Sequence, residues 1–138
     1  MSATQFFQPE GLIGEACQRT GFSNAAVLPA NAKLVVTAGQ AGMDLGTGKL
    51  VVSSDAAQIE AAFDCVDASL KAAGVSDGLA SAHKMVSYMI DCRNEPLMME
   101  IWRRRYPNRR PTWTCIGVSN MCAQGMIVEI QGEAVLSY

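Results

Sequence analysis

Glu129 is the residue of this sequence with the strongest case for acid or base chemistry. It interrupts Met126–Ile130, an otherwise apolar run, and a carboxylate in such surroundings must be hydrated, paired or neutral. A structural interpretation competes with this one. Strand alternation places Glu129, Gln131 and Glu133 on one side of the same strand, and that whole side could simply meet solvent.

A second group of side chains suited to binding or catalysis lies on the segment Pro111–Val118. Alternation places Trp113, Cys115 and Gly117 on one side of this strand. Cys115 is either a nucleophile or ligand contact, with His83 as the only histidine available as its base, or a small buried side chain. Trp113 is either a pocket wall or a core anchor, and its indole N–H requires a partner in both roles. We expect this strand to wall a small-molecule pocket.

Five of the eleven basic residues fall within eight positions and form an arginine cluster: Arg103, Arg104, Arg105, Arg109 and Arg110. Such a run is typical of a solvated helix end, and an anion or RNA patch is the alternative. No aromatic stacking platform like that of a single-strand binder accompanies it. With 13 acidic against 11 basic residues and a pI near 5.3, the chain as a whole does not attract nucleic acid or anionic membranes.

The cysteine and histidine content argues against a metal site and for a reducing compartment. The five cysteines are scattered, with no CxxC pair, and there is one histidine. No Cys/His cluster has the ligand spacing of a structural zinc site. Residues 1–21 lack the basic start and the apolar run of a signal peptide, and no stretch approaches the length of a membrane span. We expect a cytoplasmic protein that binds no metal.

These side chains must be positioned by a fold, and the sequence predicts a single α+β domain over residues 1–138. If glycine is counted as apolar and tyrosine is not, roughly 55% of the residues are apolar, against a usual ~45–50%. This excess favours a subunit interface. Alternation, helical periodicity and capping residues predict five strands and two helices, with residues 1–20 as a peripheral segment. The strands are 25–29, 33–38, 82–90, 111–118 and 126–136, and the helices are 54–73 and 94–105. The order β-β-α-β-α-β-β places two helices on one mixed sheet.

The order of elements and several segments resemble the Rid family, also called YjgF-type or L-PSP proteins. The matching segments are 35–40, 46–51, Gln58, 70–74, 84–91, 110–111, Val118 and 125–130. The resemblance covers about Ala25–Val135. It implies a chorismate-mutase-like fold, a homotrimer with a pocket at each subunit interface, and no cofactor. The best-known members hydrolyse reactive enamines and imines, such as 2-aminoacrylate, to 2-keto acids and ammonia.

The resemblance also implies which residues form the site. Glu129 falls on the family glutamate that helps to position the attacking water, and Cys115 falls on a cysteine often found in the pocket. Gly39 and Gln40 match the glycine and the residue after it on the facing wall. On this comparison Glu129 lies beside the wall formed by Trp113 and Cys115, opposite Gly39, at an inter-subunit site.

Four polar positions of the family pocket are apolar here, among them the upstream tyrosine, which falls on about Ala25. The arginine that grips the substrate carboxylate is replaced by Trp113, the pocket asparagine by Met99, and the serine before the glycine by Ala38. Indole offers a single neutral donor and cannot replace a bidentate guanidinium. The expected substrate-binding set is Trp113, Thr114, Cys115, Met99, Ala38, Gly39 and Gln40. We do not expect standard 2-aminoacrylate deamination.

Three functions remain open at this stage. The first is a diverged Rid enzyme in which Glu129 acts as general acid or base on a larger, less carboxylate-dependent substrate, by hydrolysis, isomerisation or cyclisation. The second is a non-catalytic trimer that binds a metabolite or a partner protein. The third is an RNA-cleaving or RNA-binding protein that uses the arginine cluster, against which the acidic balance argues.

Overall fold

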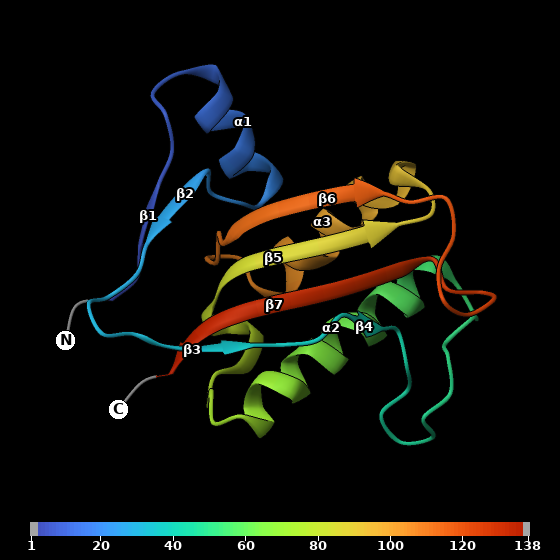
Figure 1. Cartoon of the computed structure of the whole chain (residues 1–138). Coiled ribbons are helices and arrows are strands. Elements are labelled where there is room, and N and C mark those ends of the chain that lie inside the picture. The colour runs from blue at the N-terminus through green and yellow to red at the C-terminus, as the bar shows by residue number, and fades with distance from the viewer. Residues whose placement is uncertain (1–2, 137–138) are drawn as a thin grey trace.

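The computed structural model describes residues 3–136 and consists of a sheet with helices packed on one of its faces (Figure 1). The strands are β1 (Gln5–Phe7), β2 (Ala25–Val27), β3 (Lys33–Val36), β4 (Gln40–Ala41), β5 (Ala82–Met89), β6 (Thr112–Gly117) and β7 (Val128–Leu136). The α-helices are α1 (Leu12–Thr20), α2 (Asp55–Ala72) and α3 (Glu95–Arg105), and the 3-10 turns are Gly78–Ser81 and Cys92–Asn94. The predicted α+β class is confirmed.

The main sheet is mixed, as the sequence predicts, and its fifth strand is β4 in place of the expected strand 25–29. Its strand order is β3-β7-β5-β6, with the short strand β4 also pairing with β7. Strands β5 and β6 are parallel, joined through α3, and the other pairings are antiparallel. Strand β6 therefore forms one free edge of the sheet, and β3 with β4 forms the other.

Helix α2 forms where the sequence predicts it because its ends and its apolar stripe agree. The Ser54 hydroxyl accepts a hydrogen bond from the Ala57 N–H at 3.0 Å and caps the N-terminus. Gly74 follows the helix with φ of 100°, a conformation that favours glycine. A fully buried stripe then packs α2 on the sheet: Ile59, Ala62, Phe63, Val66 and Leu70. Helix α3 likewise ends just before Pro107.

The N-terminal region differs from the expected arrangement. Strand β2 does not join the main sheet but pairs with β1 in a separate two-stranded sheet. Helix α1, β1 and β4 had no predicted counterpart. The N-cap of α1 is Gly11, with φ of 98° and no side-chain cap, so the usual start signal is absent. Strands of two or three residues are too short to show alternation.

The two faces of the main sheet differ in cover. One face packs against α2 and α3 and carries buried side chains such as Met85, Met89, Val128 and Ile130. The other face has no helix over it within residues 3–136 (Figure 1). This open sheet face comprises Leu34, Val36, Lys84, Val86, Tyr88, Thr112, Thr114, Ile116, Glu129, Gln131, Glu133 and Val135. Its exposed apolar members, with Val36 at 60% exposure, are consistent with a subunit interface.

Candidate functional site

A small cavity opens on the helix-covered side of the edge strand β6. Its volume is about 140 Å³, and we call it the Trp113 pocket. It is lined by Phe22, Glu95, Met99, Trp113 and Cys115. Three elements therefore form it: the edge strand β6, the first two turns of α3, and the residue that follows α1 and Gly21. A volume of this size holds roughly one benzene-sized ring.

Trp113 serves both as a core anchor and as a wall of this pocket. Its indole ring packs edge-on against Trp102, with centroids 5.0 Å apart, and against Phe63 at 6.2 Å. Its Nε1 donates a hydrogen bond to the Ser87 hydroxyl at 3.0 Å. The indole N–H thus has the partner that the sequence requires, and the ring is held in one orientation. This donor is already engaged and is not available to a ligand.

Cys115 lies in the pocket in a setting that favours its neutral thiol. Burial raises the pKa of Cys115, the nearby Glu95 and Cys92 raise it further, and the Ser87 hydroxyl acts in the opposite direction. His83 does not serve as its base. Its buried imidazole bonds to Glu133 at 2.7 Å, and it lies four residues before Ser87 on β5, roughly 13 Å along the strand. The chemistry of this pocket is therefore not that of a cysteine nucleophile.

Glu129 lies on the open sheet face and not on the face of Trp113. In the register of β7 it stands opposite Tyr88 on β5 and Ala41 on β4. A Cβ at Gly39 would lie 2.5 Å from Glu129 Oε2, so glycine makes room for this carboxylate. Strands β7 and β6 are two strand spacings apart, roughly 10 Å. Within one subunit, Glu129 is therefore separated from Trp113 by this distance and by the sheet itself.

The remaining expected residues divide between these two places. Ala38 and Gln40 lie with Gly39, and the Ala38 carbonyl accepts hydrogen bonds from Thr37 Oγ1 at 2.8 Å and from Gln40 Nε2 at 3.3 Å. Thr114 lies on β6 but is exposed on the open sheet face. Met99 alone joins Trp113 and Cys115 in the pocket. The chain thus places Glu129 with Gly39 in one position and Met99, Trp113 and Cys115 in another.

Two lining residues of the Trp113 pocket, Glu95 and Phe22, were missed by the sequence analysis, as was Ser87, the hydrogen-bond partner of Trp113. Glu95 precedes Met99 by four positions on α3, so the helical repeat could have placed it on the same face. Ser87 pairs with Cys115 only through the register of β5 and β6, which the sequence does not reveal. Phe22 follows Gly21, whose φ is 130°, and no local signal directs its ring toward α3.

A larger cleft of about 680 Å³ lies at the other end of β6, beside the N-terminal hairpin. It contains none of the expected site residues. Of its two arginines, Arg110 already donates to the Gln18 and Arg109 carbonyls at 2.9 and 3.0 Å. We give the smaller pocket more weight, because it contains three of the expected site residues and its lining combines an acidic group, a thiol and aromatic rings.

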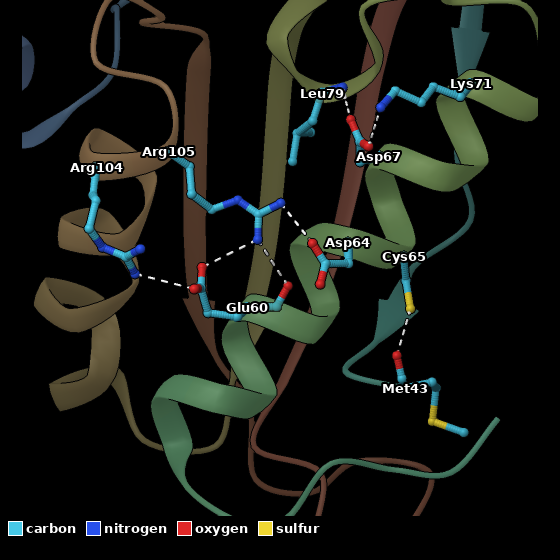
Figure 2. Close-up of polar contacts among 9 residues, drawn as sticks. All are labelled: Met43, Glu60, Asp64, Cys65, Asp67, Lys71, Leu79, Arg104 and Arg105. Atoms are coloured by element: carbon cyan, nitrogen blue, oxygen red, sulfur yellow. Dashed lines mark hydrogen bonds and ion pairs between the residues drawn. The ribbon is translucent and has the colours of Figure 1, made fainter. Parts of the chain in front are cut away.

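Four of the five arginines of the arginine cluster, Arg103, Arg104, Arg105 and Arg110, bond to other parts of the chain. Arg105 reaches Glu60 at 3.2 Å and Asp64 at 2.8 Å on α2, and Arg104 reaches Glu60 at 3.3 Å (Figure 2). Arg103 donates to the Thr20 carbonyl. The cluster therefore joins α3 to α2 and α1, which accounts for it without an RNA ligand.

Replacing Arg105 with methionine should lower the free energy of unfolding by about 2 kcal/mol. The variant keeps the apolar stem but leaves two carboxylates without their half-buried partner. Arg104→Met is the matched control, because the Arg104 side chain is 62% exposed and its pair should contribute less than about 0.5 kcal/mol. Urea unfolding at fixed protein concentration measures both values. Equal losses in the two variants would contradict a specific role for Arg105.

Comparisons with known proteins agree with this architecture. The family model described as Endoribonuclease L-PSP matches residues 15–136. The structure of YyfB from Yersinia pestis, described as a conserved Rid-family protein of unknown function, is similar with a TM-score of 0.82 and 19% identity, over 98% of this chain and 100% of that one. The YjgF gene product of E. coli has a TM-score of 0.64 and 22% identity, over 78% and 84% of the two chains.

A further similar structure is that of E. coli TdcF with bound serine, with a TM-score of 0.65 and 20% identity, over 86% of this chain and 95% of that one. Identities this low establish the fold alone. No curated protein matches the sequence. Within the described part of the chain, no group of three His, Cys, Asp or Glu side chains is placed to hold a metal ion. None of the helices there is long and apolar enough to cross a membrane.

Proposed function

We propose, from the premise that this chain belongs to the endoribonuclease L-PSP family of Rid and YjgF-type proteins, that it is a diverged enzyme acting on small imines or enamines. The observation that carries the proposal is the separation of two groups of residues, which we call half-sites. Glu129 with Gly39 and the Trp113 pocket lie on opposite faces of one sheet. Only a second copy of the chain can therefore bring its Glu129 to the Trp113 pocket of the first copy.

We therefore propose a homotrimer with its sites between subunits. The open sheet face offers exposed apolar side chains for assembly, among them Leu34, Val36 and Ile116. The Trp113 pocket lies behind the edge strand β6 and is smaller than the roughly 300–1,000 Å³ of typical ligand sites. A neighbouring subunit that supplies Glu129 and Gly39 at the pocket mouth would enlarge the site and add its acid–base group.

In the proposed reaction Glu129 takes a proton from a water molecule as the water attacks the carbon of the C=N bond. The nitrogen receives that proton to give an amino alcohol, and the hydroxyl proton then moves to the nitrogen as the C–N bond breaks, so one imine and one water give one carbonyl compound and one amine or ammonia. The same carboxylate could move a proton between two atoms of a substrate in an isomerisation or cyclisation. Neither course requires an arginine or a cysteine nucleophile.

The pocket does not favour a substrate carboxylate. A charged hydrogen bond contributes roughly 1.5–3 kcal/mol, or about one to two decades of affinity. The position of the family arginine holds Trp113, whose N–H is already bonded to Ser87. The relative TdcF has been solved with serine bound, and serine carries the carboxylate for which this pocket has no cationic partner.

Replacing Glu129 with glutamine should lower imine turnover by about 10²- to 10⁴-fold. Imines generated in situ by oxidation of amines and of amino acids are suitable substrates, and release of carbonyl product measures their hydrolysis. Glu100→Gln, an exposed change on α3, is the control and should retain full turnover. Full turnover by Glu129→Gln would exclude the mechanism. Saturable binding without turnover in the unchanged protein would instead favour the non-catalytic metabolite-binding trimer.

An RNA-directed function has no specific structural support. Arg103, Arg104 and Arg105 are committed to partners within the chain, and acidic residues outnumber basic ones. RNA affinity that falls steeply with salt, and is lost when these arginines are neutralised, would contradict this assignment.

A further inference from the structure

The Trp113 pocket is lined by one acidic side chain and by no basic one. Of its five lining residues, Glu95 is the carboxylic acid, and no lysine, arginine or histidine lines the cavity. Glu95 is half-buried, and across residues 3–136 no basic side chain forms an ion pair with it. Where the family resemblance implies a cationic pocket, this chain has an acidic and aromatic one.

The position of Glu95 explains how its half-buried carboxylate is stabilised without an ion pair. It is the first residue of α3, where the helix dipole favours a carboxylate. A purely structural role at the helix start would account for an acidic residue there. It would not account for the same residue lining a cavity with Phe22 and Trp113, one helical turn from Met99.

We propose that the Trp113 pocket binds the protonated nitrogen of an apolar, carboxylate-free substrate, an iminium or ammonium group, through Glu95 and the aromatic rings of Phe22 and Trp113. Carboxylates and aromatic rings both attract such cations. The cavity of about 140 Å³ suits a single ring or a compact cationic group. The inference rests on the proposed function, since it names the substrate class of the same site.

The behaviour of Cys115 agrees with this charge. Its pKa is raised by burial first and then by Glu95, so the pocket disfavours a negative thiolate, and the same potential favours a cation. A neighbouring subunit that brings Glu129 to the pocket mouth would add a second carboxylate. The chemistry follows, because an iminium carbon is attacked by water more readily than that of a neutral imine. Glu95 would bind the iminium group, and Glu129 would act as the general base for the attacking water.

The test compares three ligands of similar shape and different charge: benzylammonium, benzyl alcohol and benzoate. Calorimetric titration of the assembled protein should show benzylammonium binding about ten-fold more tightly than benzyl alcohol, with benzoate the weakest. Glu95→Gln, which preserves the shape of the side chain, should abolish the preference for benzylammonium. Glu100→Gln, on the same helix but exposed, should retain it.

The outcomes separate this inference from the proposed function. A preference for benzoate, or a preference for benzylammonium that survives Glu95→Gln, would overturn the cation site while leaving Glu129-dependent turnover untouched. Benzylammonium binding that depends on Glu95, without hydrolysis of any imine, would support the cation site and remove the catalytic proposal. If the cation site and the Glu129-dependent turnover are both confirmed, amine-derived imines should be hydrolysed faster than amino-acid-derived ones. Glu95→Gln should then reduce the ratio of these two rates.

Discussion

Replacing Gln58 with leucine should lower the free energy of unfolding by about 3–5 kcal/mol. Gln58 is 2% exposed on α2 and uses both ends of its amide. Its Nε2 donates to the Val51 and Gly125 carbonyls at 2.8 and 3.0 Å, and its Oε1 accepts from the Ile127 N–H at 2.6 Å. Leucine fills a similar space but leaves three backbone groups without partners, each costing about 1–3 kcal/mol.

The effect should extend to the site, because Gln58 joins the loop after β4 to the loop before β7. Gly42 packs closely on the same turn of α2, where a Cβ would lie 2.2 Å from the Gln58 carbonyl oxygen. Gln124→Leu is the control, since Gln124 is exposed in the second loop. Urea unfolding at fixed protein concentration measures both variants. A loss below about 1 kcal/mol for Gln58→Leu would show that water or a neighbouring subunit replaces these bonds.

The sequence predicts the two helices well because their signals are local. Ser54 and Gly74 mark the ends of α2, and Pro107 marks the end of α3. Strand alternation is local too, and it correctly groups Trp113 with Cys115 on one face of β6. Helix α1 lacks such a signal, since Gly11 caps it without a side chain.

Alternation cannot relate the faces of different strands, so the sequence alone does not show on which side of the sheet each expected site residue lies. Whether Glu129 shares a face with Trp113 depends on the pairing of β5 with β6 and β7. That pairing includes an irregularity between Ala82 and Lys84, and a one-residue shift of register exchanges the two faces of a strand. The family resemblance implies an inter-subunit site that contains both residues, and within the chain the structure places them on opposite faces of one sheet.

Glu95 is a residue that the family resemblance could not predict. A comparison with a family directs attention to the positions where the family has functional residues, such as Trp113 and Met99. It says little about a position that gains a functional group in one member. The charge of the Trp113 pocket emerges only when α3 is packed against β6, which brings Glu95 beside Cys115.

Replacing Val36 with lysine should convert the proposed trimer to single subunits and abolish the proposed imine turnover. Val36 is 60% exposed on the open sheet face and stands opposite Glu133 in the register of β3 and β7. In a separate subunit the lysine would face that glutamate across the strands, a mildly favourable pair that leaves the fold intact. In the assembly the same ammonium group would be buried against apolar side chains, at a cost of several kcal/mol.

Native mass and imine turnover, measured on the same sample, test this expectation. Leu45→Lys is the matched control, because Leu45 is 64% exposed in the segment after β4 and belongs to no strand of the main sheet. It should keep both the native mass and the activity. A trimeric, fully active Val36→Lys would show that subunits do not meet through this face. A monomeric variant with full turnover would contradict the inter-subunit site itself. Within one chain, Glu129 and the Trp113 pocket lie on opposite faces of the sheet and cannot act on the same substrate.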